Sequence, residues 1–404
     1  MMKTKKFTIL ISSILIFLTF AVIINPKESF EASAAGLGMW WEIVFPSLLP
    51  FFILSELLIC FGVVSFVGVL LEPFMRPVFR VPGAGAFVLA MGMASGFPSG
   101  AKLTSRLRKE NQLTKTEAER LVSFTNSSNP LFIFGAISVG FFQHPALGVV
   151  LAAAHYISNL AVGFTMRFYG KKDSNSKMER RSMLPSISLA LEKMHVKRMK
   201  ETRPFGKILS EAIVSSVQTL LMIGGFIIIF SVLNRMLSEF HILQALAVFT
   251  QSILAFFHIS TELSIPLLSG FFEITTGSRS VSVTEANMLQ KAIIVSFILG
   301  FGGFSVQAQV AGILAETDIA FKPYFLARIL QAFYASILAA LLWKPLYTSF
   351  SSPSAPVFSN DAPTNDLFFV SVWEKLVSFG PIITIVILFI SAFLMSSPSG
   401  DSKR

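Results

Sequence analysis

The stretch Ser123–Pro130, SFTNSSNP, sets small polar side chains directly before LFIFGAISVGFF, one of the most apolar runs in the chain. Asn129 precedes a proline, so helical backbone is disfavoured at Asn129, and Pro130 has no backbone N–H for a helical hydrogen bond. A helix is therefore expected to be interrupted here, with amides and hydroxyls gathered at the interruption.

The rest of the chain indicates that this interruption lies in a membrane protein. Of 404 residues, 53% are hydrophobic and only 14% are charged, whereas a soluble domain carries about 25% charged residues. Apolar segments long enough to span a bilayer recur from end to end. The sequence thus predicts an all-α polytopic membrane protein with about nine to eleven spanning or half-spanning helices.

The apolar run after the interruption is too short to cross a bilayer alone. Pro130 to Phe142 supplies 13 residues, about 20 Å of helix, against a hydrocarbon core of about 30 Å. We therefore expect the polar residues to lie at membrane depth, where irregular backbone survives only against protein or a watery cavity. The alternative places them at the cytoplasmic interface as a helix cap, after the capping-box-like TKTE (Thr114–Glu117).

Further polar groups follow other apolar runs. GMASGFPSGAK (Gly92–Lys102) combines small residues with a lysine that could attract anions, although close helix packing explains the small residues equally well. Glu273 follows an apolar run in FFEITTGSRS; an intramembrane carboxylate costs about 2.5–3.5 kcal/mol, so it marks a site unless it simply pairs with Arg279. The predicted solute-binding residues are Gly96, Ser99, Gly100, Lys102, Asn126, Ser127, Ser128, Asn129, Glu273, Thr275, Thr276 and Gln307.

Two segments of the chain resemble each other. GFPSGAKLTSRL begins at Gly96, and GFSVQAQVAGIL begins at Gly303, an offset of 207 residues. The connection 102–120 that follows the first has a net charge of +3, and its counterpart 315–327 has a net charge of −1. Opposite charge bias predicts opposite sides of the membrane, and hence an inverted repeat with a binding site between its halves.

The N-terminal region and the central connection carry topology signals. Lys3, Lys5 and Lys6 precede an apolar region of about 18 residues, which favours a retained signal anchor over a cleaved signal peptide, although EASAA (Glu31–Ala35) resembles a cleavage site. The connection 169–207 has a net charge of +7 and is expected to be cytoplasmic, with a lipid-headgroup or partner site as the alternative.

These signals divide the chain into six predicted regions: an anchor and short external segment (1–36), a first membrane repeat (37–168), a basic cytoplasmic loop (169–207), a second membrane repeat (208–347), a polar linker (348–372), and a final span with a tail (373–404).

No pattern for metal or enzyme chemistry stands out. A single cysteine excludes an internal disulfide and a cysteine metal cluster, and the five histidines lack metal-ligand spacing. Phosphate-binding, dinucleotide and nucleophile-elbow motifs are not found. We expect no cofactor, no metal and no catalytic residue. The basic residues lie between apolar segments, so the expected partner is the lipid bilayer and not nucleic acid.

Four motifs, GFPSGAK, TNSSNPLFI, FFEITTG and GFGGFSVQAQ, carry a family resemblance. The chain resembles the nucleoside-recognition (Gate) domain membrane proteins, and among them the sporulation membrane proteins of endospore-forming bacteria, from about Trp40 to Trp343. The resemblance implies a multi-pass protein of the mother-cell membrane that is required for spore cortex formation, with other sporulation membrane proteins as candidate partners and an oligomer as an open alternative. It implies kinship with nucleoside transporters without making nucleosides the cargo.

Two functions are consistent with these features. The leading hypothesis is a permease for a small polar solute, with hydrogen-bonding amides and hydroxyls, a carboxylate at Glu273 for a cation or proton, and Lys102 near the cytoplasmic mouth. The alternative is a non-transporting scaffold that recruits cortex-building enzymes through the basic loop 169–207. The two differ in which residues they require.

Overall fold

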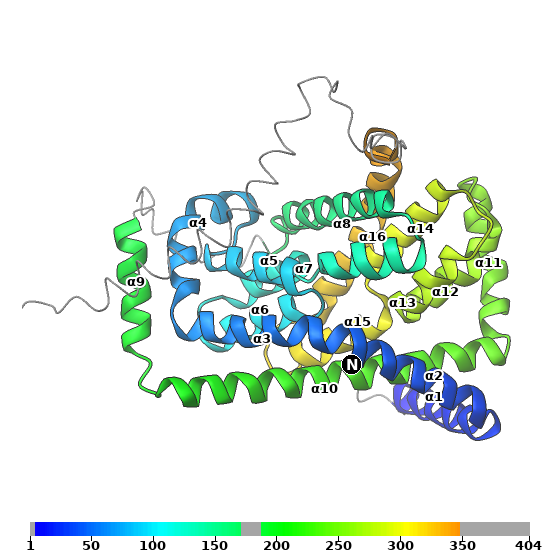
Figure 1. Ribbon diagram of the computed structural model, residues 1–404, viewed down its shortest axis with the longest axis horizontal. Coiled ribbons are helices and arrows are strands. Elements are labelled where there is room, and N and C mark those ends of the chain that lie inside the picture. The colour runs from blue at the N-terminus through cyan, green and yellow to red at the C-terminus, as the bar shows by residue number, and fades with distance from the viewer. Residues whose placement is uncertain (1–4, 171–186, 348–404) are drawn as a thin grey trace, which may run out of the picture. The chain divides into compact units, whose positions relative to one another are not determined.

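The computed structural model describes residues 5–170 and 187–347, and every regular element within those ranges is a helix (Figure 1). The all-α prediction is therefore confirmed. These residues belong to one compact unit, Met1–Ser351. The predicted linker, the final span with its tail, and the middle of the basic loop lie outside the described residues.

Apolar helices of spanning length and shorter apolar helices both occur, as the sequence predicts. Four helices are long and apolar enough to cross a membrane: Pro145–Met166, Phe205–Glu239, Met288–Leu314 and Phe321–Tyr347. Two bent pairs raise this to six if each is one crossing: Ser12–Ile24 with Pro26–Val44 (104°), and Leu48–Cys60 with Val63–Phe79 (81°). Shorter apolar helices are Ala84–Ser95, Leu131–Phe141 and Ile242–Phe256.

Within the predicted first repeat (37–168), residues 63–166 form a helical hairpin followed by an interrupted helix. The elements are α4 (Val63–Phe79), α5 (Ala84–Ser95), α6 (Ser99–Lys109), α7 (Lys115–Thr125), η2 (Leu131–Phe141) and α8 (Pro145–Met166). Helices α5 and α6 fold back on each other, since a Cβ built on Gly92 would lie 3.5 Å from the Cα of Gly100. The polar run Asn126–Pro130 separates α7 from η2, as the sequence predicts.

Within the predicted second repeat (208–347), residues 242–342 have the same order of elements. The elements are α11 (Ile242–Phe256), α12 (Ser264–Phe272), α13 (Ile274–Ser282), α14 (Met288–Phe301), α15 (Gly303–Leu314) and α16 (Phe321–Leu342). Helices α12 and α13 form the hairpin, because a Cβ on Gly277 would overlap the backbone of Gly270. Gly302, at φ +82°, interrupts α14–α15 in the left-handed conformation that glycine adopts without strain. Each repeat then ends in a continuous helix, α8 or α16.

The sides predicted for two connections are corrected by this arrangement. The connections 102–120 and 315–327 were expected on opposite sides, but Arg108 donates to both carboxylate oxygens of Asp318 at 2.8 Å, and Lys109 pairs with Glu316. They therefore lie together. The prediction of opposite sides was wrong because the two connections are not equivalent: the matched Gly-Phe pairs belong to different elements. Gly96 lies at a hairpin tip, whereas Gly303 begins the second part of an interrupted helix.

The order of elements still supports inversion, with another pairing. The equivalent connections are 110–114, between α6 and α7, and 283–287, between α13 and α14. Helices α14 and α15 together span 27 residues, about 40 Å, and their far end carries Glu316, next to Lys109. Connection 283–287 therefore lies at the opposite end of the membrane elements from connection 110–114.

A bent N-terminal arm packs along α10 (Phe205–Glu239). The arm contains α1 (Lys5–Ile24), α2 (Pro26–Met39), the short π-type helix η1 (Trp40–Val44) and α3 (Phe45–Cys60). The indole N–H of Trp40 donates to the carbonyl of Leu220 at 2.9 Å. A Cβ on Gly224 would lie 2.7 Å from the same ring, so a glycine here lets the indole lie flat on α10. Figure 1 shows α2 and α3 running beside α10.

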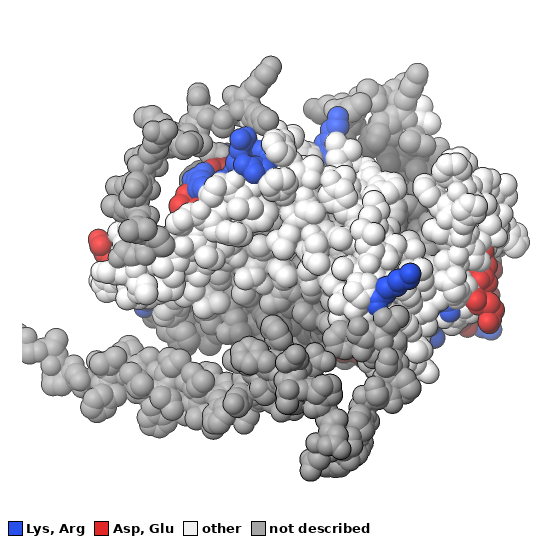
Figure 2. Space-filling view, turned by 90° about the horizontal axis from the view of Figure 1, so that it is seen from above, with Lys and Arg blue, Asp and Glu red and all other residues white. Residues whose placement is uncertain are grey.

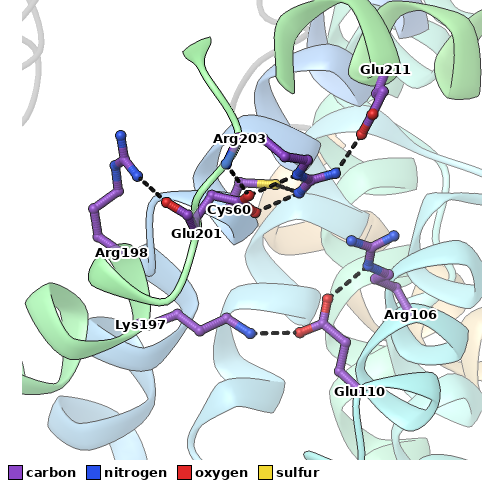
Figure 3. Close-up of polar contacts among 8 residues, drawn as sticks. All are labelled: Cys60, Arg106, Glu110, Lys197, Arg198, Glu201, Arg203 and Glu211. Carbon is purple, nitrogen blue, oxygen red and sulfur yellow. Dashed lines mark hydrogen bonds and ion pairs between the residues drawn. The ribbon is translucent and has the colours of Figure 1, made fainter. Parts of the chain in front are cut away.

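Ion pairs gather where α9 (Ile187–Met199) and its connection to α10 contact the ends of α3 and α6 (Figure 3). Glu110 accepts from Lys197 at 2.9 Å and from Arg106 at 2.8 Å. Arg203 donates to Glu201 at 2.7 Å and also pairs with Glu211. Figure 2 shows one largely uncharged face on which most visible charged side chains lie toward the margins, as expected for a membrane-embedded surface. We call the group of residues labelled in Figure 3 the basic end: Cys60, Arg106, Glu110, Lys197, Arg198, Glu201, Arg203 and Glu211.

The contact between Arg203 and Glu201 in the basic end should weaken at acidic pH. The hydrogen bonds from Arg203 lower the pKa of Glu201 from 4.5 to about 2, so the pair contributes fully above pH 4.5 and its contribution is lost as the pH falls toward 2. A spin label at V196C, in a C60S background, should become more mobile across that window. In the E201Q variant this titration step should be missing; an unchanged step in that variant would assign the transition to another group.

Candidate functional site

A cavity lies where all four helix interruptions meet. It is lined by the tip of the first hairpin (Ser95, Gly96 and Phe97), the first interrupted helix (Ser128 and Asn129), the second hairpin (Glu273, Ile274 and Thr275) and the start of α15 (Ser305, Val306 and Gln309). The space between atoms is about 630 Å³, its open mouth included. Interrupted helices at a repeat interface are the usual location of a solute site in secondary transporters.

The two interruptions of the first repeat are bonded to each other. The amide of Asn129 donates to the carbonyl of Ser95 at 3.1 Å, and its oxygen accepts from the backbone N–H of Phe132 at 2.7 Å, which caps η2. Gly96 has φ +90°, and a Cβ there would meet Asn129 at 3.1 Å. Glycine is therefore required both for the backbone conformation and for the close approach.

Glu273 connects α12 to α13 and is 2% exposed. Its backbone is extended, and its carboxylate accepts from the N–H of Thr276 at 2.7 Å, so it caps α13 in the way that favours a negative charge at a helix N-terminus. Among the described residues no ion pair joins Glu273 to Arg279 or to another cation. The alternative prediction, a structural ion pair between Glu273 and Arg279, is therefore wrong.

Five of the twelve predicted residues line the cavity: Gly96, Ser128, Asn129, Glu273 and Thr275. The other seven do not line it: Ser99, Gly100, Lys102, Asn126, Ser127, Thr276 and Gln307. The polar run Asn126–Asn129 is at most 9% exposed, so it is enclosed by protein. The capping box expected from TKTE does form, at the start of α7 between Thr114 and Glu117.

Three of these seven residues donate hydrogen bonds to backbone carbonyls or to a buried tyrosine. The Asn126 amide donates to the Tyr324 hydroxyl at 2.9 Å, and the Ser127 hydroxyl donates to the carbonyl of Gly92 at 3.2 Å. Gln307 donates to the carbonyl of Phe301 at 2.8 Å, at the end of α14. These contacts hold the interrupted backbone in place, while the side-chain oxygens of Asn126 and Gln307 accept no hydrogen bond from a described residue.

Lys102 lies away from the cavity. Its ammonium pairs with Glu56 of α3 at 3.6 Å and lies 4.8 Å from the centre of the Phe52 ring. These three residues, with Ser55, Ser99 and Leu103, line a second, smaller pocket between α3 and α6. The lysine is thus engaged in a contact between the N-terminal arm and the first hairpin.

Arg328 holds the first interruption in place and was not predicted from the sequence. It lies on α16 and is fully buried, and its guanidinium donates to the carbonyls of Asn126 (2.8 Å) and Ser123 (2.6 Å) and to the side chain of Asn159 (3.1 Å). These carbonyls belong to the last turn of α7, where helical hydrogen bonds end and a cation is favoured. A readable signal was present, since Arg328 is a charge within the apolar segment 324–346.

His155 on α8 was also missed. It is fully buried, and its Nε2 accepts from the backbone N–H of Ser128 at 2.9 Å, which places the ring proton on Nδ1. Tyr156 donates its hydroxyl to the carbonyl of Ser128 at 3.1 Å. Both polar groups of the Ser128 backbone are therefore satisfied by α8. Within the described ranges no group of three or more His, Cys, Asp or Glu side chains could hold a metal ion.

Comparisons with known proteins agree with this architecture. Residues 41–143 and 220–319 match the family described as "Nucleoside recognition" (Gate), and both segments end just after an interrupted helix. The sporulation integral membrane protein YlbJ of Bacillus subtilis (strain 168) is 61% identical over 391 residues, which cover 96% of each chain. An uncharacterized protein of Alkalihalophilus pseudofirmus is 33% identical over 123 residues, covering 29% of this chain and 26% of that protein.

No solved structure matches the chain. The family match covers about half of the residues, in both repeats, and the B. subtilis relative covers nearly all of them. The chain belongs to the nucleoside-recognition (Gate) family of multi-pass integral membrane proteins.

Proposed function

We propose that the protein is a permease for a small solute with polar groups. The observation that carries this proposal is the convergence of four helix interruptions on one cavity that contains a buried carboxylate, Glu273, with no cationic partner among the described residues. Unpaired polar groups inside a membrane cost several kcal/mol each, so a cavity of this kind persists where a function needs it.

The setting of this function is proposed from the relative. The B. subtilis protein is named for sporulation, and we infer that this chain acts in the mother-cell membrane during sporulation and is required for cortex formation. The description of the family as nucleoside recognition makes nucleosides one candidate class of cargo.

Proteoliposomes loaded with the polar metabolites of sporulating cells test the permease. Wild-type protein should release at least one metabolite faster than empty liposomes do, and E273Q should slow that release about ten- to hundredfold, because a hydrogen bond to a charged group contributes about 1.5–3 kcal/mol. E285Q is the matched control, since Glu285 is exposed in the connection after α13. Identical release by wild-type protein and by empty liposomes would contradict the proposal.

A scaffold is the second candidate, and it is favoured by the exposed apolar side chains of α9, where Ile187 is 65% exposed and Met199 is 67% exposed. Replacing residues 171–186 with a glycine–serine linker and changing exposed residues of α9 should abolish cortex formation if the protein recruits enzymes. The same changes should be tolerated if it is a permease, whereas E273Q should then block cortex formation.

A further inference from the structure

The cavity has two unlike walls. The helix interruptions supply its polar wall, while the N-terminal arm and α10 supply an apolar one, made by Met39, Ile43, Val44, Leu48, Ile223 and Ile227. The apolar wall belongs to neither hairpin nor interrupted helix, so it is not needed to satisfy the backbone at the interruptions. A solute with polar groups alone would leave this wall without a partner.

The polar wall retains unused hydrogen-bonding groups. Ser128, Ser305 and Gln309 line the cavity, are at most 2% exposed, and make no side-chain hydrogen bond to another described residue. Buried polar groups are normally hydrogen-bonded, and leaving one unmade costs about 1–3 kcal/mol. These three side chains are therefore available for the polar part of a ligand, beside the carboxylate of Glu273.

One residue that lines the cavity also lies on the outer surface of the protein. Leu131 lines the cavity and is 59% exposed. It follows the interruption between α7 and η2 and is the first residue of η2. The rest of the outward face of η2 is apolar, with Val139 53% exposed and Phe134 38% exposed. We expect an exposed face of this composition in a membrane protein to contact lipid.

We propose that the cavity binds an amphiphile, a molecule with a hydrogen-bonding head and an apolar body, which enters sideways from the bilayer past Leu131. The head contacts Ser128, Ser305, Gln309 and Glu273, and the body lies against the N-terminal arm and α10. The proposal rests on the permease function and narrows its cargo from a polar solute to one with an apolar portion.

The lateral mouth is tested by spin labels in lipid nanodiscs, with C60S as background because Cys60 is the only cysteine in the sequence. L131C carries the test label, V139C is the lipid-facing control, and E285C is the aqueous control. A label at L131C should collide with oxygen more than with a water-soluble nickel chelate, as at V139C. Preferential collision with the nickel chelate would mean a water-filled mouth, and shielding from both reagents would mean a protein cover; either result overturns lateral entry.

The same labels test the class of ligand. Hexyl glucoside should reduce the oxygen collisions of the L131C label and leave those of the V139C label unchanged, whereas glucose should change neither. Q309A should abolish the effect of hexyl glucoside at L131C. Equal effects of glucose and hexyl glucoside, or no effect of either, would overturn the amphiphile. These outcomes do not depend on flux, so a failure here leaves the E273Q transport result to decide the permease separately.

Discussion

The G100A variant is expected to unfold at a markedly lower temperature than the wild-type protein. A Cβ on Gly100 would overlap the carbonyl of Thr125 and lie 2.8 Å from the backbone nitrogen of Asn126. These are backbone atoms at the end of α7, which no rotamer change can move. Overpacking usually costs about 1–3 kcal/mol when side chains can yield, so we expect about 3 kcal/mol or more here. Thermal unfolding of detergent-purified protein, followed by circular dichroism, measures the change.

G225A is the matched control for this substitution. Gly225 also lies in a helix, α10, but a Cβ there would meet nothing within 4 Å. Alanine favours helix over glycine by about 1 kcal/mol, so G225A should unfold at the same temperature as wild type or higher. If G100A melted like G225A, the hairpin would not be packed against the end of α7 as described.

R328Q should destabilise the protein by a similar amount. It leaves three acceptors without their donor, the carbonyls of Ser123 and Asn126 and the side chain of Asn159. Each buried unpaired acceptor costs about 1–3 kcal/mol, partly offset because a cation no longer has to be buried. We expect the free energy of unfolding to fall by about 3 kcal/mol. The measurements are a lower unfolding temperature and an increase in oxygen collisions with a spin label placed at S128C.

Two variants separate the geometry of Arg328 from its charge. R328K keeps the charge but not the planar fork, so it should fall between wild type and R328Q. R235Q removes an exposed arginine that pairs with Glu239 within one helix, a contact that contributes about 0.3–0.5 kcal/mol, and should leave the unfolding temperature nearly unchanged. An R328Q protein as stable as R235Q would show that the end of α7 needs no cation.

Both large effects converge on the same feature, the C-terminal turn of α7. Gly92 and Gly100 allow the Thr125 carbonyl to lie against the first hairpin, and Arg328 from the second repeat binds the carbonyls on either side of it. The interruption before Pro130 is therefore held by two other elements, one from each repeat. This explains why a run of amides and hydroxyls can be buried there.

The sequence predicted where the helices are interrupted, but it did not predict correctly which segments of the two repeats correspond. SFTNSSNP, GFPSG and Glu273 each mark an interruption, because proline lacks a donor, glycine adopts φ values denied to other residues, and a capping carboxylate satisfies free N–H groups. The repeat pairing from Gly-Phe matches was wrong in register, since a hairpin tip and an interrupted helix can share the same local residues.

The sequence by itself determined that this is an all-helical membrane protein with polar interruptions in its helices, because hydropathy and backbone restrictions are properties of local residues. Only the tertiary structure decided that the interruptions meet at one cavity, that Arg328 binds carbonyls some 200 positions earlier in the chain, and that the N-terminal arm supplies an apolar wall. Every residue carries the same carbonyl, so the one-letter code cannot reveal which carbonyls lack a partner until the helices are packed.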